Sequence, residues 1–130
     1  MGAWGSGPFE NDDALDLLIK LRDTTAENQP RQIRLALTLP EGYVQVSASS
    51  EAVAAAALVA AANGMLLQEP AEAAELVRSG AVPAGDEVRQ LAGAALSRVT
   101  GNESEWRELW DEAGLLTEAT SILDQILAHL

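Results

Sequence analysis

The alanine-rich segment from Ser50 to Asn63 constrains the fold of this chain more than any other part of the sequence. It predicts a helix, because Ser50 is a favoured N-cap, Glu51 follows in the first turn, and the pair Asn63-Gly64 provides a left-handed stop. Small side chains let neighbouring helices approach closely, so we expect this helix at the centre of the molecule with partners on several sides. Its apolar run, residues 52–62, is too short to span a bilayer, which takes about 20 residues.

Apolar residues at helical spacing predict further helices on both sides of this segment. Capping and helix-breaking residues mark their ends, such as Asn11 before the first, Ser104 or Asn102 before the sixth, and Thr117 after the break at Gly114. The predicted segments cover approximately residues 11–23, 30–39, 70–79, 86–99, 104–113 and 117–130.

One segment leaves two alternatives open, since the apolar residues between Ile33 and Leu39 alternate as they would in a strand. We favour a short helix, because the only nearby extended stretch, Tyr43–Val46, is isolated. The sequence therefore predicts an all-α fold. We expect a compact single domain, residues 1–130, of about five to seven helices with an ordered glycine-rich N-terminal loop.

The charge balance restricts the classes of partner. The 130 residues hold 20 acidic and 8 basic side chains, a formal net charge of −12. Such a surface repels nucleic acid and anionic membranes, so we expect neither as a partner. It attracts a basic protein, although the same charge would also keep a small protein soluble. The chain has no cysteine and no signal-like apolar segment, which fits a cytoplasmic protein.

The N-terminal block is the first candidate site. Its residues are Trp4, Gly5, Gly7, Phe9, Glu10, Asn11, Asp12 and Asp16. In a structural interpretation the two aromatic rings plug one end of the bundle and Asn11 caps the first helix. The glycines permit positive φ angles and let the backbone pass close to a packed wall.

In a functional interpretation, the carboxylates of this block form a surface site. A glycine-rich stretch before a helix can bind phosphate, but phosphate is disfavoured here by the absence of lysine and by the four carboxylates of Glu10, Asp12, Asp13 and Asp16. A divalent cation would suit carboxylates better, yet the spacing of an EF-hand is missing. We therefore expect no metal and no cofactor. We also expect no catalytic residue, since the single histidine, His129, lies in the last turn of the chain.

The second candidate site is an aromatic and acidic helix. Trp106, Leu109 and Trp110 form one stripe, which predicts packing into the core. In the alternative, the tryptophans are exposed anchors for a partner, and acidic residues form the rim of the interface. This candidate interaction surface comprises Trp106, Glu108, Trp110, Asp111 and Glu112.

The opening from Gly2 to Asp12 resembles that of a bacterial family, domain of unknown function 4259. Its members typically begin Gly-x-Trp-Gly-x-Gly-x-Phe, followed by an acidic residue, Asn and Asp. The segment from Ser104 to Glu112 is similar to a later Ser-Glu-Leu-x-x-Leu-Trp-x-Glu element, with Trp106 where the family more often has leucine. The alanine-rich centre is shared too. The resemblance implies an all-helical cytoplasmic domain and implies no reaction.

Two hypotheses of function follow. The first is a binding or interaction protein that acts through its acidic surface. This hypothesis is favoured over an enzyme. In its sharper form it is an inhibitor or immunity-type protein that neutralises a basic partner, such as a nuclease, by presenting carboxylates where phosphates would lie. The alternative is an enzyme or metal-binding protein with a carboxylate site near the N-terminal block.

Overall fold

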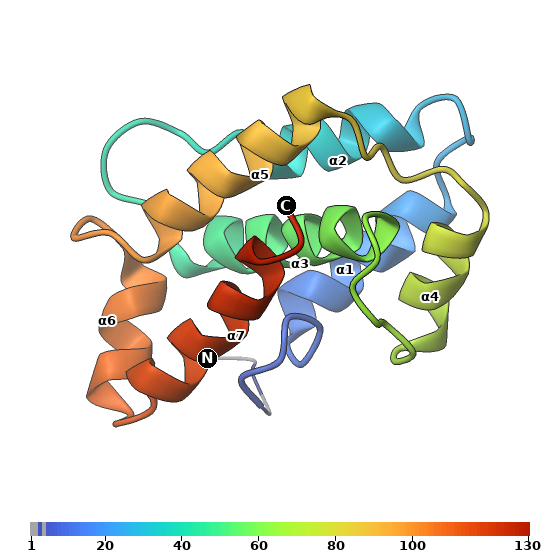
Figure 1. Ribbon diagram of the computed structural model, residues 1–130. Helices are drawn as coiled ribbons and strands as arrows, with labels where there is room; N and C mark the ends of the chain where they lie inside the picture. Colours follow the sequence, from blue (N-terminus) through green and yellow to red (C-terminus); the bar gives the residue numbers. More distant parts are fainter. Residues whose placement is uncertain (1–2, 4) are drawn as a thin grey trace.

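The computed structural model describes residue 3 and residues 5–130, and in it the helix α3 (Val46–Ala62) lies at the centre (Figure 1). Ala54, Ala55, Ala56 and Ala57 are all fully buried. Successive helical residues point about 100° apart, so four buried neighbours in a row mean that the helix is covered on every side. Each of the other helices packs against α3, as predicted for an alanine-rich centre.

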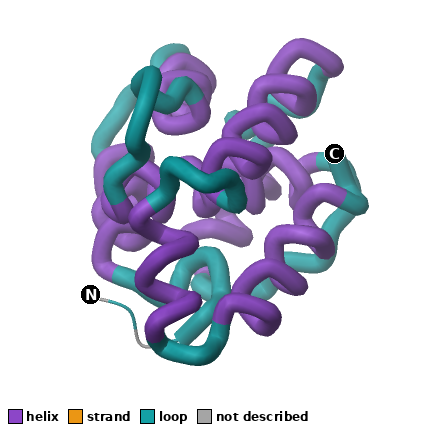
Figure 2. The backbone as a smooth tube through the Cα atoms, turned by 90° about the vertical axis from the view of Figure 1, so that its left-hand side faces the viewer, coloured by secondary structure: helices purple, strands orange, loops and turns teal. Residues whose placement is uncertain are grey.

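The all-α prediction is confirmed, and the described residues form seven helices. The other six are α1 (Asp12–Arg22), α2 (Gln29–Leu37), α4 (Ala71–Arg78), α5 (Asp86–Val99), α6 (Glu105–Glu112) and α7 (Leu116–Leu127). Helices and loops account for the whole described trace in Figure 2, without a strand. Residues 29–37 are helical, so the strand alternative for this segment is wrong. Of the described helices, none combines the length and apolar character needed to cross a bilayer.

The central helix begins earlier than the sequence predicted. It starts at Val46, so Ser50 lies inside the helix rather than at its cap. The reason is a carboxylate from another helix: Glu105 Oε1 accepts a hydrogen bond from the Val46 N–H at 2.7 Å. An anion is favourable at a helix N-terminus, where backbone N–H groups lack partners. Glu105 therefore caps α3 from a position far away in the sequence.

The extended stretch before α3, which looks isolated in the sequence, pairs with the segment before α6. Val44 is fully buried and forms an isolated parallel bridge with Ser104. Its N–H donates to the Glu103 carbonyl at 2.9 Å, and its carbonyl accepts from the Glu105 N–H at 3.0 Å. Ser104 in turn caps α6 by accepting from the Arg107 N–H at 3.2 Å, as one of the two predicted caps. These bonds fix the starts of α3 and α6 relative to each other.

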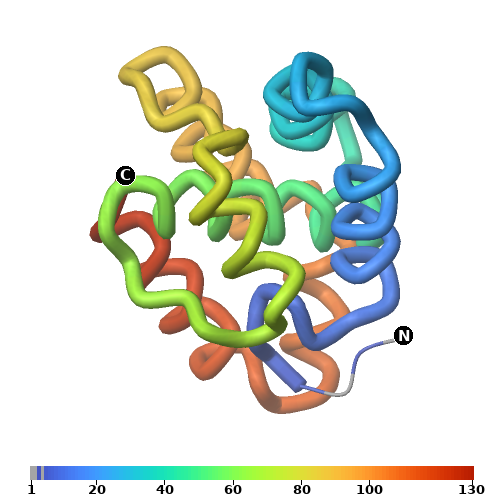
Figure 3. Tube along the Cα trace, turned by 90° about the vertical axis from the view of Figure 1, so that its right-hand side faces the viewer, coloured from blue at the N-terminus to red at the C-terminus, as the bar shows by residue number. Residues whose placement is uncertain are grey.

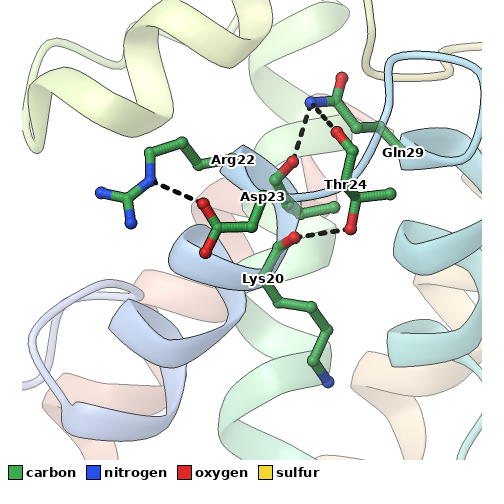
Figure 4. A network of polar contacts seen from close by, with 6 residues as sticks. Lys20, Arg22, Asp23, Thr24 and Gln29 are labelled. Atoms are coloured by element: carbon green, nitrogen blue, oxygen red, sulfur yellow. Dashed lines mark hydrogen bonds and ion pairs between the residues drawn. The ribbon is translucent and has the colours of Figure 1, made fainter.

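The connection between α1 and α2 is closed by side chains (Figure 4). The Thr24 hydroxyl donates to the Lys20 carbonyl at 2.6 Å, and the Gln29 amide donates to the Leu21 carbonyl at 2.9 Å. Carbonyls at a helix C-terminus lack intrahelical partners, so these bonds stabilise the end of α1. Arg22 pairs with Asp23 beside them, with an Nε to Oδ1 distance of 3.2 Å.

The last helix boundary also differs from its prediction. Gly114 has a φ of +75° and ends α6, as predicted. However, α7 begins at Leu116, so Thr117 lies within the helix and does not cap it. Leu115 occupies the N-cap position without a side-chain hydrogen bond. The Leu115 N–H donates back to the Trp110 carbonyl at 3.0 Å, so the short turn after α6 leaves no room for a separate cap.

Candidate functional site

The described part of the N-terminal loop packs on the end of the bundle. Phe9 is 5% exposed and belongs to the hydrophobic core, as the structural interpretation predicts. Ala3 forms an antiparallel bridge with Asn11, and the Ser6 hydroxyl donates to Glu118 Oε1 of α7 at 3.3 Å. Trp4, the other aromatic residue of the block, lies outside the described residues. The loop is thus joined both to the start of α1 and to α7.

Gly5 and Gly7 leave room for the carboxylate of the exposed residue Glu10. Gly7 does not have a positive φ, so the conformational freedom of glycine is not used at that position. Both instead make room for one carboxylate: a Cβ at Gly5 would lie 2.6 Å from Glu10 Cδ, and a Cβ at Gly7 would lie 3.1 Å from it. Gly7 N–H donates to Glu10 Oε1 at 3.0 Å, and Glu10 N–H donates to the Gly7 carbonyl at 3.1 Å. Glu10 therefore closes the loop on itself.

This arrangement gives a first prediction. Gly7→Ala is expected to lower the free energy of unfolding by about 1 kcal/mol, because the added methyl group displaces the Glu10 carboxylate from the Gly7 N–H. In a Glu10→Ala background the same substitution should cost nothing, since the φ of Gly7 suits alanine. Urea denaturation of the four proteins in this double-mutant cycle measures the coupling. Equal losses in both backgrounds would show that Glu10 is not what requires glycine there.

The start of α1 is capped as predicted but does not gather the carboxylates into a cation site. Asn11 Oδ1 accepts from the Ala14 N–H at 2.8 Å. Asp12 and Asp16 are exposed, while Asp13 is half-buried. Over the described residues, no group of three His, Cys, Asp or Glu side chains is placed to hold a metal ion. The negative charges of Asp12 and Asp13 are favourable in the first turn of α1, where the helix dipole is positive. Helix stability alone therefore explains why acidic residues occur there.

The two tryptophans of α6 lie in the core. Trp106 is 6% exposed and Trp110 is 7% exposed, and their ring centroids are 6.3 Å apart with planes at 59°. Tilted pairs at this distance are a favourable aromatic arrangement. Both rings are therefore part of the core, as the first interpretation predicts, and neither is an exposed anchor. What α6 presents to solvent is its acidic side: Glu108, Asp111 and Glu112 are all exposed.

Tyr43 shows how acidic this surface is. Its hydroxyl donates to Glu108 Oε2 at 2.9 Å. Desolvation of the phenol, this hydrogen bond and the charges of Glu108, Glu105 and Glu112 raise the pKa of Tyr43 to about 12. A negative charge at Tyr43 would be repelled by three carboxylates, so the phenol stays protonated to a higher pH than a free tyrosine does. Glu108 is consequently held in place, whereas Asp111 and Glu112 are not hydrogen-bonded by side chains in the described part of the chain.

The structure brings the two predicted regions together at one cavity of about 200 Å³. The N-terminal loop and the start of α1 form one wall, and α3, α6 and α7 form the others. Its polar lining includes Ser6, Asn11, Asp13 and Ser50, and its apolar lining includes Trp106, Trp110 and Leu123. Sequence reasoning missed Ser50 as a lining residue because it assigned Ser50 to a cap. The spacing of Ser47 and Ser50, one helical turn apart, was the available signal.

Charge is distributed unevenly over the molecule. We name the end that carries the N-terminal loop, α6 and α7 the acidic end; α2 and α5 lie on the opposite side (Figure 1). Residues 1–11 and 103–130, which build the acidic end, hold eight acidic side chains and one basic one, Arg107. Residues 12–102 hold twelve acidic and seven basic side chains. The three ion pairs among the described residues all lie in that second part.

These features define a small all-helical domain with one strongly acidic end and a cavity beneath its N-terminal loop. Residues 2–121 match the model of a protein family described as a domain of unknown function (DUF4259). The match covers most of the chain, so the protein belongs to this family. No similar curated protein and no similar solved structure was found.

Proposed function

We propose that this protein is a binding protein whose acidic end attracts and holds a basic protein partner in the cytoplasm. The observation that carries the proposal is the separation of charge. More than half of the net charge of −12 comes from the residues that build the acidic end, which carry a charge of −7, whereas the rest of the chain holds seven basic side chains against twelve acidic ones. A charge kept only for solubility has no need of one end, whereas a docking surface does.

The acidic side of α6 supports the proposal because it is rigid and accessible. Trp106 and Trp110 fix the helix in the core, so the carboxylates on its outer side are presented at defined positions. Asp111 and Glu112 are exposed and make no ion pair with the described lysine and arginine side chains. A partner therefore does not have to break an internal pair in order to bind them.

The most specific form of the proposal is an inhibitor or immunity-type protein. A nuclease binds phosphates through lysine and arginine side chains, and a row of carboxylates satisfies the same side chains. Occupying them with protein carboxylates would exclude the nucleic acid. Such complexes associate quickly, because long-range attraction between opposite charges steers the encounter.

Capture from native lysate tests the proposal with two matched charge reversals. The first variant is Asp111→Lys with Glu112→Lys on the acidic end. The control is Glu72→Lys with Glu75→Lys, two exposed residues of α4 that give the same change of net charge. We expect the wild type and the control to capture basic proteins that elute as salt rises, and the first variant to lose them. Salt acts because charges are screened beyond about 10 Å at 0.1 M.

The association and dissociation rates of a captured partner provide a quantitative test. Reversal of Asp111 and Glu112 should slow association at low salt by about tenfold and change dissociation less, since steering acts before contact. If the captured proteins are no more basic than the lysate, the proposal is wrong. It is also wrong if binding is unchanged at high salt, or if the α4 control loses as much binding as the α6 variant.

A further inference from the structure

A second hollow also borders the N-terminal loop. This groove has a volume of about 490 Å³ and lies between the loop, α7 and the connection from α3 to α4. In Figure 3 that connection, drawn in green, runs beside α7, drawn in red. The groove is mainly apolar, with Leu15, Met65, Leu66 and Ile122 among its lining residues. Its volume is within the range of pockets that bind ligands.

Leu66 is the side chain that most needs an explanation. It is 80% exposed, more than any other large hydrophobic residue among those described. A single exposed leucine is ordinary, but this one stands at the edge of a continuous apolar groove. The Met65 N–H donates to the Ala60 carbonyl at 3.0 Å, so the backbone that carries Leu66 is anchored to the end of α3. The groove therefore exposes apolar surface on a fixed frame.

Charge determines which occupant fits. The two charged residues among the described lining are both carboxylates, Glu10 and Glu69. A second copy of this chain would bring another net charge of −12 against them and would be repelled. An apolar segment flanked by lysine or arginine would bury its apolar side chains and place its charges beside Glu10 and Glu69.

We propose that this groove binds an amphipathic basic segment of the protein partner, with the apolar face of that segment against Leu66, Met65 and Ile122. The inference rests on the proposed function for the charge of the partner. Gly7 and Pro8 line both the groove and the cavity, so the N-terminal loop is the ridge between them. A partner segment in the groove continues over this ridge towards the exposed carboxylates of α6.

A pair of synthetic helical peptides tests the proposal: one of leucine and lysine, and a twin in which glutamate replaces every lysine. Binding of each labelled peptide is measured by fluorescence anisotropy. The leucine-lysine peptide should bind the wild type, and Leu66→Ser should weaken it about tenfold or more through lost apolar burial. The control is Leu35→Ser on α2, a leucine that is 55% exposed on another face, which should change affinity less than about twofold.

A second pair of variants keeps the test independent of Leu66. Glu69→Lys should weaken the leucine-lysine peptide, whereas Glu72→Lys, an exposed residue outside the groove, should weaken it less. The groove assignment is overturned if Leu66→Ser behaves like Leu35→Ser, or if the glutamate twin binds equally well. It is also overturned if sedimentation shows a dimer of the wild type that Leu66→Ser abolishes, since a second copy then covers the groove.

Failure of this inference and failure of the proposed function give different results. If reversal of Asp111 and Glu112 abolishes capture of the basic partner while Leu66→Ser leaves that capture intact, the acidic end binds the partner and the groove does not. If neither variant affects the partner, the proposed function has failed as well.

Discussion

Replacing Trp110 with alanine is expected to lower the free energy of unfolding by about 3–5 kcal/mol, the usual cost of removing a buried aromatic side chain. Trp110 is 7% exposed, packs against Trp106 and lines the cavity with it. A domain of this size has a total stability of about 5–15 kcal/mol, so this single change removes a large part of it. Urea denaturation followed by circular dichroism measures the loss.

The control for Trp110→Ala is Leu127→Ala, a change at a leucine of α7 that is 41% exposed. It should cost no more than about 0.5 kcal/mol, because little apolar surface is uncovered. If Trp110→Ala leaves the denaturation midpoint where it was but abolishes partner binding, the ring is an interface anchor and its place in the core is wrong. Because loss of a core tryptophan would destabilise the fold, the charge reversals on α6 leave both tryptophans unchanged.

Local signals in the sequence located most of the helices. Asn11 caps α1 and Ser104 caps α6 through bonds to residues three positions ahead, so both starts were readable from the sequence alone. Positive φ angles at Gly64 and Gly114 likewise follow from local backbone geometry. The alanine-rich segment indicated the centre of the fold, because its small side chains let neighbouring helices approach closely from several sides.

The start of α3 was misplaced because its cap comes from elsewhere in the fold. Glu105 is 59 positions away from Val46, and no pattern within either segment relates them. Ser50 was the best local candidate for a cap, so local reasoning chose it. The same limit applies to Val44, whose extended conformation was predicted but whose partner segment, residues 103–105, was not.

The candidate site was predicted in two separate parts. The N-terminal block and α6 each stood out by composition, but their convergence on one cavity depends on how α3 and α7 hold them. The role of Gly5 and Gly7 also depends on a contact, since only the position of the Glu10 carboxylate shows what a side chain at these positions would displace. The apolar groove gave no signal in the sequence, because Met65 and Leu66 occur in a connection that looks ordinary.

Ala56→Leu should be the most damaging single addition to the core. Ala56 is fully buried at the middle of α3, and residues on all sides of the helix are covered. Three added carbon atoms have to push a neighbouring helix outwards, which costs about 1–3 kcal/mol even though leucine is a good helix former. The same substitution at Ala128, an exposed residue after α7, provides the control and should be nearly neutral.

Thermal and urea denaturation of both leucine variants decide whether close packing around α3 holds the fold together. If Ala56→Leu is as stable as the wild type, there is unfilled space beside α3. The alanine content of α3 would then reflect only the high helix propensity of alanine. If it is destabilised as expected, the reverse change in size should also be harmful. Leu58→Ala removes a fully buried side chain from the same helix and should cost about 2–5 kcal/mol, because the helices around α3 are held at a fixed distance and cannot close the cavity left behind.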